Sequence, residues 1–278
     1  MRSVDAIKAM LALGALSAGL GGCASSARQE EVAYVERPVE TIYNEGMALI
    51  DKRQWDGAAL QFDEVQRQHP YSPWAQQSLL MAAYARYKSH DYEKAISGAQ
   101  NYITLHPGGE GAPYAYYLVA ICHFDQIIDV GREQSRSELA LGALNEVAAR
   151  FPDSEYARDA ELKRDMVRDQ LAGKEMEIGR YYLRRNEHLA AINRFRRVIE
   201  NYDDTTHTPE ALHRLVEAYL SIGLKGQAQE VAAVLGYNYP GSDWYKDTYA
   251  LMTGEGLEVP DKPHGATNWL TRMFGGIL

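Results

Sequence analysis

Cys23 is the residue near the start of the chain whose neighbours point to a specific reaction. It follows Leu20, Gly21 and Gly22, so a branched apolar residue and two small residues precede a thiol. Small residues let a peptidase reach the bond before the cysteine, and the thiol can carry a diacylglycerol. The run has the form of a lipobox and predicts cleavage before Cys23 and covalent lipid on its sulfur. A chance cysteine after an ordinary signal peptide is the alternative.

The residues before Cys23 fit a signal peptide over residues 1–22. A basic start is followed by an apolar stretch over residues 9–20, which is too short to span a bilayer. A lipoprotein with three acyl chains is stably anchored, since two already suffice. The residue after Cys23 is Ala24 and not an aspartate, as in enterobacterial lipoproteins that are sorted to the outer membrane. We expect a lipid-anchored protein on the periplasmic face of the outer membrane, with residues 23–37 as a polar tether.

A second group of residues has the chemistry to bind a peptide. Six aromatic residues fall on the expected inner wall of the first half of the chain: Tyr43, Tyr84, Tyr87, Tyr114, Tyr117 and Phe124. The chain has nineteen tyrosines and five phenylalanines, and tyrosine suits surfaces where a ring is buried and its hydroxyl is wet. These rings predict a groove for a short extended peptide with apolar or aromatic side chains. The alternative is that many of them pack between neighbouring helices.

Three arginines form a third candidate site. The segment NRFRRV is expected to expose Arg194, Arg196 and Arg197 in a chain whose formal net charge is −9 at pH 7. A solvated helix face is the commonest explanation for such a charge run. Docking onto an acidic patch of a partner protein is the functional alternative. The negative net charge argues against a nucleic-acid partner.

Enzymatic chemistry has no candidate residues. The sequence lacks a Walker loop, an HExxH helix and a G-x-S-x-G turn. Cys122 and His123 are adjacent on an expected helix, so their side chains point about 100° apart and make a poor catalytic dyad. We expect no metal site and no cofactor other than the covalent lipid on Cys23, and we expect that the protein is not an enzyme.

An internal repeat predicts the elements that position these residues. The tetratricopeptide pattern requires a small or apolar residue on the first helix of a hairpin, alanine and a larger residue on the second, and a proline that stops it. The first unit supplies Gly46, Ala58, Phe62 and Pro70, and related sets begin at Ala83, Ala120, Gly179 and Val216. In the fourth unit Asp203 stands where the proline is expected. The sequence therefore predicts an all-α solenoid of about five helical hairpins.

The repeats divide the mature chain into segments. Three repeats are expected over residues 38–153, and a long helix with two further repeats over residues 154–253. A flexible tail is expected over residues 254–278, with apolar residues near its end. No alternation typical of a strand is present.

The segments IYNEGMALIDKRQWDGAALQFDEV, HPYSPWAQQSLLMAAYARYKSHDYEKAI, ARFPDSEYARDA and GRYYLRRNEHLAAINRF follow one another in this order. With them the chain resembles the BamD family, the outer-membrane lipoproteins of the β-barrel assembly machinery. The resemblance covers roughly Val39 to Tyr239. It implies that the first three repeats hold C-terminal targeting segments of unfolded barrel proteins. It also implies that the later repeats contact the BamA barrel subunit near Arg194, and that other assembly lipoproteins are partners.

The sequence therefore leaves two functions open. The first is a non-catalytic scaffold subunit of the complex that assembles outer-membrane β-barrels. The second is a periplasmic, lipid-anchored adaptor for cell-envelope, division or pilus-assembly proteins, because several such proteins use similar FPDSEYA repeats.

Overall fold

The computed structural model describes residues 36–127 and 134–261. In these ranges the chain forms eleven α-helices and no strand, which confirms the all-α prediction. All of these helices belong to one compact unit, which begins at Arg37. The helices are α2 (Val39–Asp51), α3 (Trp55–Gln68), α4 (Pro73–Lys88), α5 (Tyr92–Leu105), α6 (Ala112–Asp125), α7 (Ser135–Arg150), α8 (Glu155–Arg184), α9 (His188–Asn201), α10 (Thr208–Ser221), α11 (Lys225–Asn238) and α12 (Asp243–Gly254).

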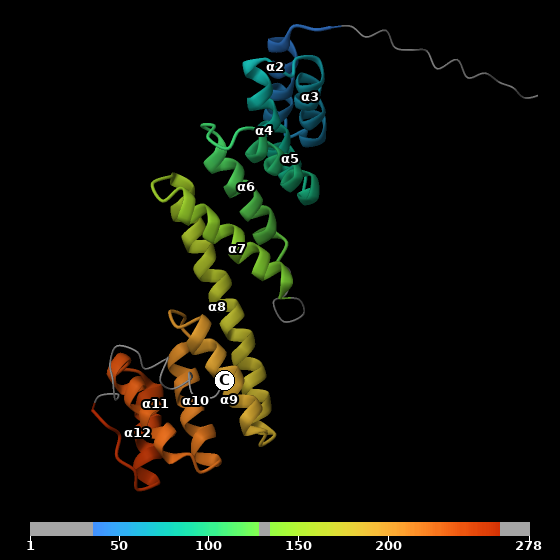
Figure 1. The fold of residues 1–278 in the computed structure, drawn as a ribbon. Coiled ribbons are helices and arrows are strands. Elements are labelled where there is room, and N and C mark those ends of the chain that lie inside the picture. Colours follow the sequence, from blue (N-terminus) through green and yellow to red (C-terminus); the bar gives the residue numbers. More distant parts are fainter. Residues whose placement is uncertain (1–35, 128–133, 262–278) are drawn as a thin grey trace, which may run out of the picture. The chain divides into compact units, whose positions relative to one another are not determined.

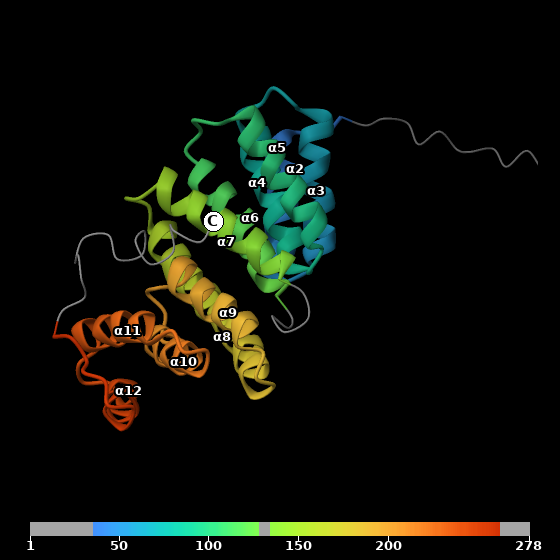
Figure 2. The same ribbon diagram turned by 60° about the horizontal axis from the view of Figure 1, so that its bottom comes forward.

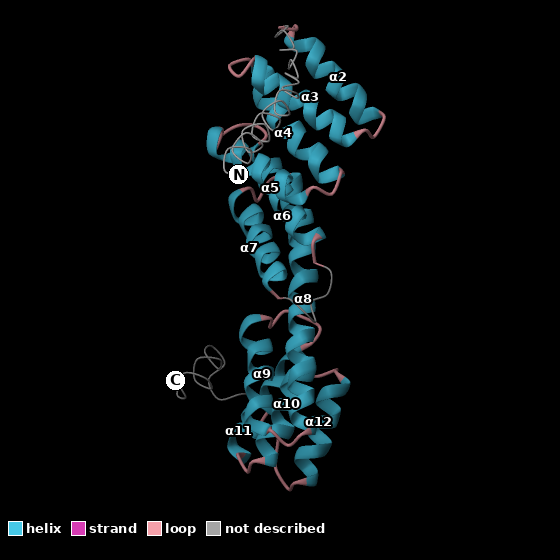
Figure 3. Cartoon of the chain, turned by 90° about the vertical axis from the view of Figure 1, so that its right-hand side faces the viewer, coloured by secondary structure: helices cyan, strands magenta, loops and turns pink. Residues whose placement is uncertain are grey.

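Each helix packs against the next one along the chain, as expected for stacked hairpins (Figure 1). A second set of contacts joins α2 to α4, α4 to α6, α6 to α8, α8 to α10 and α10 to α12. The even-numbered helices therefore form a continuous inner layer, and the odd-numbered helices lie behind them. Figure 3 shows the same succession of helices from another side. Side chains of different hairpins meet in this inner layer, so a shared binding surface is expected there.

Small residues let the two helices of a hairpin approach closely. A Cβ atom added to Gly46 of α2 would lie 2.8 Å from Cε1 of Phe62 on α3, and Gly179 of α8 faces Phe195 of α9 in the same way. Ala58, at the predicted alanine position, is fully buried. The predicted register of the repeat is therefore the register of the structure.

The outer helices end alike whether or not a proline follows. The five residues after α3, α5, α7, α9 and α11 all leave the helical conformation, with φ of −132 to −138° and ψ of 38 to 57°. After α9 Asp203 stands at the proline position, and two threonines bond to the end of the helix, as Ser154 does after α7. Thr205 and Thr208 donate their hydroxyls to the carbonyl of Tyr202 at 2.8 and 3.1 Å.

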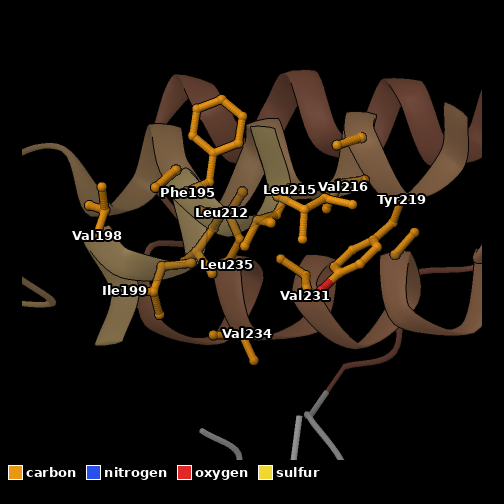
Figure 4. Close-up of a cluster of buried hydrophobic side chains, with 14 of the residues drawn as sticks. Phe195, Val198, Ile199, Leu212, Leu215, Val216, Tyr219, Val231, Val234 and Leu235 are labelled. Atoms are coloured by element: carbon orange, nitrogen blue, oxygen red, sulfur yellow. The ribbon is translucent and has the colours of Figure 1, made fainter. Parts of the chain in front are cut away.

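Helix α8 is a single helix of 30 residues that serves as an inner helix twice. Its residues up to Leu171 pack with α6 and α7, and its residues from Ala172 onward pack with α9 and α10. Figures 1 and 2 both show it running from α7 to α9. The long helix predicted after residue 154 is thus one continuous element. Beyond it, Phe195, Leu212, Leu215 and Leu235 pack together between α9, α10 and α11 (Figure 4).

The C-terminal end departs from the predicted boundaries. Helix α12 follows the fifth hairpin and packs on α10 and α11, so it covers the apolar end of the last repeat. Leu257 and Val259 also pack against this core. The first residues of the predicted tail over 254–278 therefore belong to the packed body, because apolar side chains continue past the helix. Residues 262–278 lie outside the described part of the chain.

Candidate functional site

An aromatic cavity of about 510 Å³ opens beside the inner helix α4. Two of the predicted groove residues, Tyr84 and Tyr87, line it. The other lining residues are Arg53, Trp55, Lys88, His90 and Asp125. They come from the turn before α3, the start of α3, the end of α4, the turn between α4 and α5, and the end of α6. The cavity is therefore lined by residues of the first three hairpins.

The geometry of the cavity combines apolar ring faces with charged edges. The Trp55 and Tyr84 rings meet edge to face, with centroids 6.3 Å apart. Lys88 Nζ lies 5.8 Å from the Trp55 ring centroid and 5.8 Å from that of Tyr87. Tyr87 donates its hydroxyl to Asp125 Oδ2 at 2.8 Å. Burial, together with this carboxylate, raises the pKa of Tyr87, so the hydroxyl stays a donor even at pH values where a free tyrosine loses its proton.

Tyr114 and Tyr117 of α6 do not line this cavity and pack between α6 and α8, which is the alternative that the sequence left open. Tyr87, Tyr114 and Tyr117 pack against one core cluster. Tyr114 and Tyr117 also meet Tyr156 of α8, with ring centroids 5.4 and 5.2 Å apart. Phe124 is half-buried, and Lys163 Nζ lies 5.7 Å from its ring centroid. We call the set Trp55, Tyr84, Tyr87, Tyr114, Tyr117 and Tyr156 the aromatic wall.

Tyr43 does not belong to this wall. Its ring is 6% exposed and packs against Phe62 and Trp74, with centroids 5.4 and 4.7 Å apart. The expectation that Tyr43 faces the groove is therefore wrong. The physical reason is that Trp74, at the start of α4, covers the ring from the next hairpin.

Sequence reasoning also missed two members of the wall. Trp55 begins an outer helix, so the inner-helix pattern does not reach it. Tyr156 follows Ser154 by two residues, as Trp74 follows Ser72, and these serines cap the starts of α8 and α4. The sequence could have indicated Tyr156 through this shared pattern, in which an aromatic residue follows the capping serine by two positions.

The three arginines of α9 differ in exposure and in partners. Arg194 Nη1 contacts Glu175 Oε1 and Oε2 at 3.3 and 3.1 Å, and Arg197 Nη1 lies 3.5 Å from Oε1. Arg196 pairs with Glu200 at 3.3 Å. The side chains of Arg194, Arg196 and Arg197 are 29%, 15% and 56% exposed. The prediction that all three are exposed is wrong, because Glu175 of α8 and Glu200 hold two of them close to the helices.

No group of three or more histidine, cysteine or acidic side chains in the described ranges has the geometry to hold a metal ion. Cys122 is buried, and burial raises its thiol pKa to about 12. No helix in these ranges is long and apolar enough to cross a membrane. The lipidation site predicted at Cys23 lies outside the described residues.

Stacked hairpins with a common inner layer define a tetratricopeptide-like helical-repeat protein. The chain belongs to the YfiO family, described as outer membrane lipoprotein, whose family model matches residues 35–235. It is 52% identical over 248 residues to the outer membrane protein assembly factor BamD of Caulobacter vibrioides, over 89% of this chain and 81% of that protein. It is 42% identical to the Rickettsia prowazekii protein of the same description, over 91% and 98% of the two chains.

Solved structures are more distant. A thermophilic tetratricopeptide-repeat protein of Thermus thermophilus matches with a TM-score of 0.37 and 19% identity, over 78% of this chain and 99% of that one. The family membership carries the functional conclusion: the chain has a role in outer-membrane protein assembly and is associated with the outer membrane.

Proposed function

We propose that this protein is the non-catalytic scaffold subunit of the complex that assembles β-barrels in the outer membrane. In this role it binds targeting segments of unfolded barrel proteins on the aromatic wall, and it binds the central barrel subunit through the arginines of α9. Covalent lipid on Cys23 holds both sites at the periplasmic face of the membrane. The observation that carries the proposal is the cavity at Tyr84 and Tyr87 in a member of this family.

The chemistry of the cavity suits an extended peptide from a barrel strand. Such a segment alternates apolar or aromatic side chains with polar ones, and its rings can stack on Trp55, Tyr84 and Tyr87. Lys88, which lies near two of these rings, adds a cation beside the apolar surface. Two or three rings contributing ~1–2 kcal/mol each above the ordering cost give about 2–6 kcal/mol, which corresponds to a Kd between tens of millimolar and tens of micromolar. That strength suits a client that must be released.

The arginine surface suits a protein partner with an acidic side chain. Arg197 is more than half exposed, and the chain as a whole has a negative net charge. Because the guanidinium group matches the geometry of a carboxylate, this position favours an acidic contact. The relatives named as assembly factors make the barrel subunit the partner to test first.

Peptide binding can be tested with the purified chain and a fluorescent peptide that copies the last strand of an outer-membrane barrel protein. Tyr84→Ala should weaken binding about tenfold, since one stacking partner is lost. Tyr237→Ala is the matched control, because Tyr237 is exposed on α11, which contributes nothing to the cavity. Equal affinities of the wild type and the Tyr84 variant would show that the cavity does not bind client peptides.

The partner can be tested by purifying the tagged protein from membranes in mild detergent. Recovery of the barrel subunit at near one-to-one ratio supports the scaffold function. Recovery of division or peptidoglycan proteins without a barrel subunit would instead support the adaptor function.

A further inference from the structure

Glu175 is a carboxylate that helix α8 buries against α9. Its side chain is 6% exposed, and both oxygens face the arginines of the next helix. A buried carboxylate is costly unless it is paired and hydrogen-bonded, and Arg194 meets this requirement with contacts to both oxygens. Glu175 and Arg194 are therefore a neutral pair.

Arg197 is a second cation at the same carboxylate. Its Nη1 lies 3.5 Å from Glu175 Oε1, a longer contact than those of Arg194. Among the described residues, Glu175 is its only ion-pair partner. Two guanidinium groups share one carboxylate, so the cluster carries one net positive charge, and it is carried by the more exposed arginine.

We propose that Glu175 sets the affinity of the arginine surface for an acidic side chain of the partner, by competing with it for Arg197. This inference rests on the proposed function, because it assumes that the arginines of α9 contact the barrel subunit. An incoming carboxylate finds the net charge of Arg197 but also meets the charge of Glu175 close behind it. The contact is therefore weaker than two arginines alone would make it, and it can be released.

The competition predicts a gain of affinity on removal of one charge. Glu175→Gln keeps the size of the side chain and one carbonyl oxygen for Arg194, but it removes the negative charge. Binding to an acidic partner should become about fivefold tighter at low ionic strength, because a repulsive charge roughly 6 Å from the incoming carboxylate is gone. The gain should shrink in about 0.5 M salt, since screening weakens charge interactions at this distance.

Helix α10 offers a matched control. Glu210 is also shielded, with 14% exposure, and it also joins two arginines: Arg180 Nη1 at 2.9 Å and Arg214 Nε at 3.5 Å. Glu210→Gln removes the same charge from a shielded cluster in which Arg214 also pairs with Glu217 at 2.7 Å, and none of the three α9 arginines is involved. It should leave the affinity for the partner unchanged.

The experiment measures binding of the full chain, in detergent, to the purified periplasmic region of the barrel subunit from the same organism, at two salt concentrations. Tighter, salt-sensitive binding of Glu175→Gln with unchanged binding of Glu210→Gln supports the inference. Unchanged or weaker binding of a folded Glu175→Gln protein, judged by circular dichroism and Tm, would overturn it.

A second variant decides the matter if Glu175→Gln does not fold. Arg197→Gln leaves the neutral Arg194–Glu175 pair intact and removes the net charge, so binding should fall about tenfold. Unchanged binding of Arg197→Gln would contradict the inference. Failure of the wild type to bind the barrel subunit would instead contradict the proposed function itself.

Discussion

At the scale of single residues, Cys122 shows how burial determines chemistry. Its side chain is fully buried, and desolvation raises its thiol pKa to about 12, with Asp125 adding to the shift. The thiolate is the reactive form, so the native thiol should be inert at pH 8. Because the folded pKa lies above the unfolded value near 8.5, its contribution to stability is complete below that pH and is lost as pH rises toward 12.

This is checked by thiol titration with dithionitrobenzoate in a Cys23→Ser variant, which leaves Cys122 as the only cysteine. We expect no reaction at pH 8 in the native state and one thiol per chain in 6 M guanidinium. Rapid reaction of the native protein would show that Cys122 is accessible.

Two glycines in helices should respond in opposite ways to the same substitution. Gly46→Ala places a Cβ 2.8 Å from the Phe62 ring, so it should lower the free energy of unfolding by about 1–3 kcal/mol. Gly142, within α7, has no atom within 4 Å of an added Cβ, so Gly142→Ala should raise it by about 0.5–1 kcal/mol through helix propensity. Urea unfolding of both variants measures the difference. A stabilising Gly46→Ala would contradict the close packing.

Residue-level function was only partly predictable because its determinants are not local in sequence. Tyr84 and Tyr87 could be placed on the inner wall from the repeat alone. Tyr43 has the same kind of position, but Trp74 from the next hairpin covers it. In the same way, the exposure of Arg194 depends on Glu175, which lies on the preceding helix. A periodic pattern predicts which face a side chain occupies, but not which neighbour covers it.

At the scale of elements, four of the hairpin turns contain one residue with a positive φ angle. Arg53, His90, Asn186 and Gly223 all have positive φ, from 57° to 78°. They stand between the inner and outer helices of four hairpins, and only one is glycine. Gly223→Ala should therefore lower the free energy of unfolding by about 1 kcal/mol.

The control for this turn is Gly226→Ala, three residues later. Gly226 lies at the start of α11 with open space around it, so alanine should be neutral or slightly stabilising there. Chemical denaturation of both variants checks the prediction. Equal effects would mean that the turn tolerates a side chain and that the positive φ at Gly223 is not required.

Element boundaries were predictable where composition marks them and harder to predict where the usual marker is missing. Proline marks the ends of α3, α5, α7 and α11 in the sequence. The end of α9 lacks this marker, and its turn is held by threonine hydroxyls instead. Helix α12 was not predicted as a cap, because its role is defined by the apolar end of the last hairpin that it covers.

At the scale of the whole molecule, Tyr202 connects two parts of the core. Its ring packs against the cluster of α6, α7 and α8, and also against the cluster of α8 to α12. The Arg168 guanidinium lies 5.8 Å from its ring centroid, and Arg168 also pairs with Asp204 at 2.6 Å. In repeat proteins, stability is a sum of unit terms and nearest-neighbour contacts. Tyr202 therefore contributes to the coupling between the two groups of repeats.

Replacing Tyr202 by alanine should uncouple the unfolding of the two groups. We expect a loss of about 2 kcal/mol, less than for a fully buried aromatic residue, because the ring is only partly buried. The two groups can be followed separately, since Trp55 and Trp74 lie in the first hairpins and Trp244 lies in α12. Variants that keep either Trp244 or the first two tryptophans, each with Trp269→Phe, report one group at a time.

In the wild-type background the two reporters should give the same urea midpoint, and in Tyr202→Ala they should separate. Tyr219→Ala is the control, because Tyr219 is buried in the C-terminal cluster alone. It removes the same side chain but leaves the contact between the groups, so the midpoints should fall together. Coincident midpoints in Tyr202→Ala would mean that the continuous helix α8 carries the coupling by itself. Separated midpoints would mean that a helix shared by two groups of repeats needs side-chain contacts across the joint to make them unfold as one.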